Sequence, residues 1–298
     1  MTMDFLNDIL QYSYLSNAVA ACLLSSITCS IIGTYIVARR MVFLCGGITH
    51  ASFGGLGIAF YAGLNPIGGA MLFAILSALG IERLSYSNRI REDSAIGMVW
   101  GVGMAIGALF MSLRPGYTSG EMSNYLFGNI LTVTSNDVMA LTALTAIIIL
   151  GAALWHRQIM YVAFDRDFAQ ASGINTRLVG YVMATLSAVT IVLSIRIMGI
   201  VLLISLLTMP VVTANTLTKR YTRIALLAIL FASLAALSGI TASYYLEVPS
   251  GPAIIFSLTL LLLIIKIVYL CVLKARVRAK TLAHKAKLLY EEDTQTRP

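Results

Sequence analysis

Long apolar runs, separated by short polar clusters, fill most of this chain. Each run reaches the length of roughly 18 residues or more that a helix needs to cross the hydrocarbon core of a bilayer. The pattern predicts an all-α, polytopic membrane protein. Its nine spans are expected at residues 16–38, 41–63, 66–84, 94–113, 136–155, 177–195, 197–217, 224–246 and 250–273.

The sixth and seventh spans come from one run that is too long for a single crossing. Residues 178–217 contain one charged residue, Arg196. As a straight helix they would extend about 60 Å, twice the thickness of the hydrocarbon core. We therefore expect the chain to fold back near residues 196–199. Gly199 at this turn and Pro210, which should kink the seventh span, are the candidate hinges of a gate.

Composition and charge agree with a membrane protein. Hydrophobic residues make up 58% of the chain and charged residues 11%, against roughly 45–50% and about 25% in soluble domains. With the N-terminus outside and the C-terminus cytoplasmic, only Arg114 and Arg196 of the 21 Lys and Arg residues fall outside, as the positive-inside rule requires. The net charge of +8 then reflects membrane flanks, and no nucleic-acid partner is expected.

Three segments outside the spans have a distinct pattern. Residues 114–135, predicted outside, mix aromatic residues with Gly, Asn and Ser and suit a re-entrant or interfacial piece. Residues 156–176, predicted inside, resemble a short helix that ends at Gly173 and form the best candidate for a docking element. Residues 274–298 form a basic tail, predicted to be a cytoplasmic amphipathic helix that follows a single transmembrane domain over residues 1–273. Such a tail can also be only an anchor.

One ionisable side chain is predicted deep in the membrane. His50 follows the cytoplasmic Arg40 by ten residues, which places it about 15 Å up a helix and near the midplane. A neutral imidazole is a good ligand for zinc and related metals, so His50 is the candidate metal ligand. Thr49, Ser52 and Cys45 are the candidate neighbours along the same path. One His cannot complete a metal site, so other ligands must come from other helices or another chain. The alternative is a His that is hydrogen-bonded to backbone.

The source of energy is not encoded in this chain. All 13 acidic residues fall at span ends, in loops or in the tails, which argues against a proton- or sodium-coupled carrier. The sequence has no G-x-x-x-x-G-K-[ST] phosphate loop. It also lacks the H-E-x-x-H and G-x-S-G motifs, so a membrane-embedded enzyme is not expected.

Six segments, in order and at comparable spacing, carry a family resemblance. They are residues 10–18, 38–41, 91–97 (E-x-x-A-I-G), 125–131 (Y-L-F-G-x-I-L), 164–169 with Gly173, and 199–214. Together they resemble the integral-membrane permeases of the zinc and manganese class of bacterial ATP-binding-cassette (ABC) importers. Two departures stand out: Gly46 occupies the position of an Asp that the family places one turn before the His, and residues 211–212 are Val-Val instead of Ala-Ala. The missing carboxylate weakens the case for manganese.

The resemblance implies a permease subunit of the cytoplasmic (inner) membrane and not an enzyme in itself. It implies a homodimer in membrane lipid, two ATPase subunits that bind ATP, and an extracytoplasmic metal-binding protein. The transported species would be a divalent metal, zinc before manganese or iron, with no permanently bound cofactor. The residues expected to couple to the ATPase are Phe164, Asp165, Asp167, Ala169 and Gly173. A permease for a metal chelate or haem, or a transport-inactive structural or regulatory subunit, is the alternative.

Overall fold

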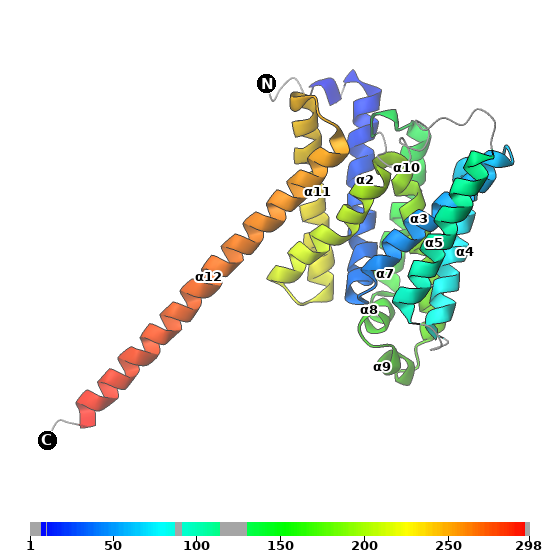
Figure 1. The fold of residues 1–298 in the computed structure, drawn as a ribbon. Helices are drawn as coiled ribbons and strands as arrows, with labels where there is room; N and C mark the ends of the chain where they lie inside the picture. Colours follow the sequence, from blue (N-terminus) through cyan, green and yellow to red (C-terminus); the bar gives the residue numbers. More distant parts are fainter. Residues whose placement is uncertain (1–6, 10, 87–90, 114–129, 296–298) are drawn as a thin grey trace.

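The computed structural model describes residues 7–9, 11–86, 91–113 and 130–295, with side chains as far as residue 274 except at position 131. Within these ranges all regular structure is helical (Figure 1). The long helices are α2 (Ser13–Ala38), α3 (Val42–Tyr61), α4 (Pro66–Tyr86), α5 (Glu92–Ser112), α7 (Ser135–Leu154), α10 (Thr176–Leu217), α11 (Tyr221–Leu246) and α12 (Ser250–Gln295). The short ones are η1 (Ile130–Thr132), α8 (His156–Phe164) and α9 (Arg166–Ala171).

Among the described residues, eight helices are long and apolar enough to cross a membrane. One of them, α10, has 42 residues and breaks at Gly199, where φ is 75° and ψ is 170°. This backbone conformation is open almost only to glycine, because a Cβ atom would clash there. Pro210 keeps helical dihedral angles, so the break in α10 lies at Gly199.

Contacts at the two ends of the part of α10 before the break, together with the course of the chain in Figure 1, show that the chain reverses here. Before it, the hydroxyl of Tyr86 donates a hydrogen bond to the carbonyl of Thr176 at 2.6 Å, and Arg196 reaches Asp137 in the first turn of α7 at 2.5 Å. After it, α10 returns to the end from which it started (Figure 1). The predicted fold-back near residues 196–199 is confirmed. With α10 counted as two segments, the described helices provide nine segments that could cross a membrane.

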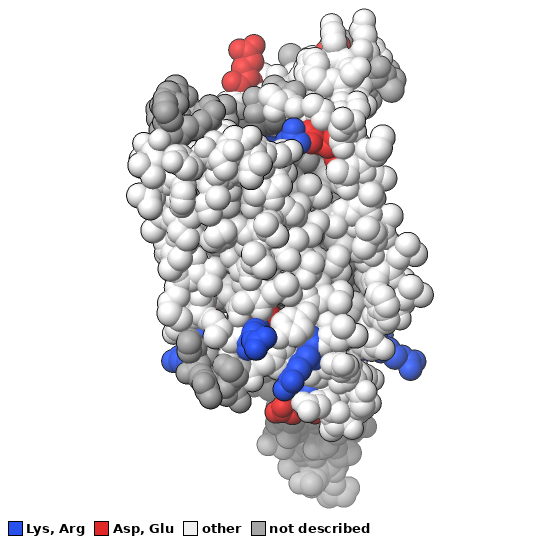
Figure 2. Space-filling view, turned by 90° about the vertical axis from the view of Figure 1, so that its right-hand side faces the viewer, with Lys and Arg blue, Asp and Glu red and all other residues white. Residues whose placement is uncertain are grey.

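Basic residues gather at one end of the bundle, which we call the basic end. It comprises the α2–α3 corner with Arg39 and Arg40, the α7–α10 connection with Arg166, and the α10–α11 corner with Lys219. Figure 2 shows the blue side chains near the lower end, a broad white band above them, and one blue side chain beside a red one near the upper end. The start of α2 and the far end of α12 lie at opposite ends (Figure 1). That the basic end faces the cytoplasm stays a prediction of the positive-inside rule.

Glycine contacts bring α3 close to its neighbours. A Cβ atom on Gly54 would lie 2.9 Å from the carbonyl oxygen of Gly103, and one on Gly57 would lie 2.6 Å from that of Gly107, both on α5. Small residues at such crossings let two helix backbones touch. The helix that carries His50 is therefore held firmly against α5.

Some predicted segments lie partly outside the described residues. Of the predicted outer segment 114–135, residues 114–129 are outside them, as is most of the 125–131 motif. The remainder of that segment contains η1 and leads into α7, whose first turn is closed by a capping box between Thr134 and Asp137. The backbone of α12 continues from the predicted ninth span to Gln295 as one helix.

Candidate functional site

His50 lies halfway along α3, on a face that is open in a single copy of the chain. It is the ninth of 20 residues, about 12 Å from the start of the helix. Phe43 and Tyr61, seven residues before and eleven after it, project from the same face because these spacings are close to whole helical turns. They are 68% and 52% exposed, while His50 is half-buried. We call Phe43, His50 and Tyr61 the α3 stripe.

The His50 ring stacks on the indole of Trp100 from α5. The two ring centroids are 4.3 Å apart and the planes differ by 10°. The Nδ1 atom of His50 is buried and has no hydrogen-bond partner within the described part of the chain. The structure therefore does not support the alternative in which the backbone holds this ring. It leaves an imidazole whose Nδ1 atom has no partner among the described residues.

The three other residues predicted along the path lie in the interior. Thr49, Ser52 and Cys45 are all fully buried. The Ser52 hydroxyl donates to the Thr49 carbonyl at 2.6 Å, and the Thr49 hydroxyl has no partner among the described residues. The structure thus separates these three from the α3 stripe, and their role in a path stays a prediction. No group of three or more His, Cys, Asp or Glu side chains that could hold a metal occurs in the described ranges.

The predicted coupling residues come together in α8 and α9 at the basic end. Asp165 caps α9 by accepting a hydrogen bond from the Phe168 backbone N–H at 2.9 Å. Ala169 is buried, whereas Phe164, Asp167 and Phe168 are exposed. Gly173, with φ of 80°, ends the segment in the left-handed conformation expected of a C-terminal cap. The segment therefore exposes two phenylalanine side chains outside the spans, together with the acidic side chains of Asp165 and Asp167.

A buried ion network, not foreseen from the sequence, ties α9 to the transmembrane helices. Glu82, near the end of α4, is 1% exposed and lies between two guanidinium groups. One is that of Arg39, 3.2 Å away, and the other is that of Arg166, 2.8 Å away. Glu92, at the start of α5, joins the same two arginines at 3.5 and 3.7 Å. The Ser85 hydroxyl bridges Glu92 and Arg166.

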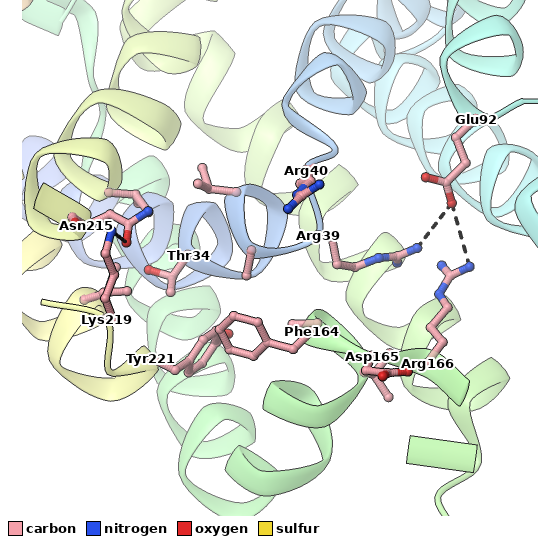
Figure 3. Close-up of a pocket in the computed structure, with 16 residues that line it drawn as sticks. Thr34, Arg39, Arg40, Glu92, Phe164, Asp165, Arg166, Asn215, Lys219 and Tyr221 are labelled. Carbon is pink, nitrogen blue, oxygen red and sulfur yellow. Dashed lines mark hydrogen bonds and ion pairs between the residues drawn. The ribbon is translucent and has the colours of Figure 1, made fainter. Parts of the chain in front are cut away.

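A cavity of about 810 Å³ opens beside this network. Figure 3 shows Arg39 and Arg166 reaching Glu92 at one side of the cavity, with Lys219 held by Asn215 at the other. Its walls come from the ends of α2 and α10, from the segment around Phe164, and from the starts of α5 and α11. The cavity therefore lies where the predicted docking element meets the bundle.

Glu82 and Trp100 could not be recognised as site residues from the sequence. Glu82 has the appearance of an ordinary charge at the end of a span, and its burial depends on arginines from two distant segments. Trp100 is one apolar residue in an apolar helix, and its contact with His50 depends on the crossing of α3 and α5. Glu92, by contrast, belongs to the E-x-x-A-I-G segment and could be found from the sequence.

The bundle of membrane-length helices, the position of His50 halfway along α3 and the predicted coupling segment agree with the family indicated by the sequence motifs. The profile of the ABC 3 transport family matches residues 11–269, and the chain belongs to this family. It is a multi-pass protein of the cytoplasmic membrane and a permease of the metal ABC transporter class.

Named relatives and a solved structure support this assignment. The manganese transport system membrane protein MntC of Listeria monocytogenes is 32% identical over 263 residues, covering 88% of this chain and 93% of the relative. MntC of Halalkalibacterium halodurans is 33% identical over 251 residues, covering 84% and 86%. The structure described as PsaBC from Streptococcus pneumoniae in complex with Fab matches with a TM-score of 0.78 and 25% identity, covering 89% of this chain and 95% of the other.

Proposed function

We propose that this chain is the permease subunit of an ATP-driven importer of a divalent transition metal, with zinc as the preferred ion. The observation that carries the proposal is His50. Its Nδ1 atom has no partner in the described part of the chain, and it lies halfway along a helix long and apolar enough to cross a membrane, in a chain of the metal ABC permease family. Imidazole nitrogen is a preferred ligand of zinc and other late first-row metals. A carrier also needs weak, incomplete binding, because a complete set of ligands would release the ion slowly.

The α3 stripe supports a homodimer. In a single copy, the half-buried imidazole of His50 would face hydrocarbon, and polar nitrogens without partners are costly there. A second copy of the chain would cover this face and bring a second imidazole to the same depth. Two His residues and water molecules could then coordinate a metal ion transiently during transport, which a single His cannot do.

The ligand chemistry favours zinc over manganese for this chain, although relatives are named as manganese transport proteins. Helix α3 contains no acidic residue, and those of α5, Glu92 and Asp93, stand in its first turn. Manganese prefers hard oxygen ligands such as carboxylates, whereas zinc binds imidazole well. A path whose ionisable group is an imidazole therefore suits zinc better.

The basic end supports docking of an ATPase. Phe164 and Phe168 offer an exposed apolar surface on α8 and α9, and Arg166 links this segment to Glu82 and Glu92. Movement of α9 by an ATPase would pull on α2, α4 and α5 through these charges. Access to His50 would then switch from one side of the membrane to the other. The opposite end, at η1 and the start of α7, is the expected docking side of the extracytoplasmic metal-binding protein.

Metal accumulation tests the proposal. Cells that lack the gene and cells in which it is restored are supplied with zinc, manganese or iron, with and without ATP depletion. Restoration should raise zinc uptake in an ATP-dependent way. His50→Ala should remove this gain, whereas the control His284→Ala, in the tail, should keep it. Unchanged uptake of all three metals with His50→Ala would remove the metal role of this residue.

A further inference from the structure

The contact between α3 and α5 contains a second feature that bears on which ion can pass. Gly46 lies one turn before His50, so both residues project from the same side of α3. Trp100 covers both positions. Its ring stacks on His50, and its six-membered ring lies over Gly46, where a Cβ atom would be 3.2 Å from Cζ3 of the indole.

The contact distances show that Trp100 packs closely over Gly46. A Cβ–carbon distance of 3.2 Å is shorter than ordinary van der Waals contact, and two further indole atoms lie at 3.7 and 3.9 Å. A Cβ atom at position 46 would require the indole to move by a few tenths of an ångström. Glycine at position 46 therefore gives Trp100 the room to lie flat against α3.

The chemistry of the indole decides what this arrangement does. Its N–H can donate a hydrogen bond, but the ring offers no acceptor with which to bind a cation as a ligand. It fills the space in which an oxygen ligand one turn from His50 would stand. It also restricts rotation of the imidazole, because stacked aromatic rings gain from a fixed offset geometry. Trp100 is 36% exposed, so it belongs to the same open face as His50.

We propose that Trp100 is a specificity-determining residue of the metal path, which holds the His50 ring and keeps an oxygen ligand out of the space above Gly46. This inference rests on the proposed role of His50 in passing a divalent metal. Wild-type protein then presents nitrogen from His50 without a carboxylate beside it and selects zinc over manganese. Opening the space and adding a carboxylate should shift selection toward manganese.

The uptake test is a double-mutant cycle on the full chain in the restored cells, with zinc and manganese measured in parallel. Gly46→Asp alone should impair uptake of both ions, because the side chain collides with the indole. Trp100→Ala alone should lower zinc uptake several-fold without adding manganese uptake. The Gly46→Asp/Trp100→Ala protein should raise the ratio of manganese to zinc uptake at least tenfold. Gly46→Asn/Trp100→Ala, which has the same shape without the charge, should not.

Two further variants separate stacking from general stability. Trp100→Phe keeps an aromatic ring over His50 and should retain the wild-type ratio. Trp155→Ala changes the only other tryptophan of the chain, at the end of α7, and should leave the ratio unchanged.

In purified Trp155→Phe protein, zinc chloride should change the fluorescence of Trp100, and His50→Ala should abolish this response.

The outcomes distinguish this inference from the proposed function. If wild-type protein takes up no metal in any arm, the proposed function fails. If wild-type protein transports zinc, but the Gly46→Asp/Trp100→Ala protein keeps the wild-type ratio, the role of Trp100 in specificity is overturned. A zinc response of Trp100 that persists without His50 would overturn the positioning role. Equal zinc uptake by Trp100→Ala and wild-type protein would do the same.

Discussion

At the scale of single residues, Glu82 is the clearest source of stability at the basic end. Its carboxylate is almost fully buried and pairs with two guanidinium groups that come from segments far apart in the sequence. Removing one partner of a buried ion pair leaves uncompensated charge, which typically costs about 3–5 kcal/mol. Glu82→Gln keeps the size of the side chain and removes its charge. We therefore expect this change to lower the thermal unfolding temperature of the purified protein markedly.

The matched control for this change is Glu247→Gln. Glu247 is an exposed residue that ends α11, and exposed charges contribute about 0–1 kcal/mol. The unfolding temperatures of both variants are measured by heating the purified proteins in detergent and monitoring the folded fraction by size-exclusion chromatography. Equal unfolding temperatures for Glu82→Gln and wild-type protein would show that the network of Arg39, Glu82 and Arg166 does not stabilise the fold.

At the scale of elements, Gly199 permits the reversal of α10. Its φ of 75° and ψ of 170° fall in a region that costs a residue other than glycine about 1–3 kcal/mol to adopt. Gly199→Ala should therefore destabilise the protein by about this amount and reduce uptake, because the two halves of α10 would meet at an altered angle.

Gly80→Ala is the control for Gly199→Ala. A Cβ atom there would meet nothing within 4 Å, and alanine favours a helix over glycine. Stability of Gly199→Ala equal to wild type would contradict this reading of the turn.

The α9 segment gives a second prediction at this scale. Phe168→Ala removes an exposed ring and should leave the permease folded, since the residue contributes little to the core. If α8 and α9 dock the ATPase, co-purification of ATPase activity with the permease should fall several-fold, and metal uptake should fall with it. Leu260→Ala, an equally exposed apolar residue on the membrane-spanning part of α12, should change neither. Full ATPase recovery with Phe168→Ala would place the docking surface elsewhere.

The elements were far more predictable from the sequence than their contacts. The lengths of the apolar runs predicted the spans, and a 40-residue run with a single charged residue predicted the turn at residues 196–199. The position of His50 halfway along α3 followed from its distance in the sequence to Arg40, which lies at the α2–α3 corner. The burial of Glu82 and the stacking of Trp100 did not follow, because each depends on which helices cross, and the pattern of a single segment does not encode its partner.

At the scale of the whole molecule, the open α3 stripe leads to the last prediction, which concerns the dimer. Three of the four cysteines are buried, and Cys271 on α12 is exposed, so Cys271→Ser gives a background without reactive thiols. Tyr61→Cys or Phe43→Cys then places one thiol on the stripe, at either end of α3. If a second copy covers this face, bifunctional maleimides of increasing length should link two chains in membranes, with yields that depend on linker length. Phe256→Cys, on the exposed face of α12, should give no such product. Dimers linked through α12 but not through the stripe would place the interface on the other side of the bundle, and a metal path between two copies of His50 would then be excluded.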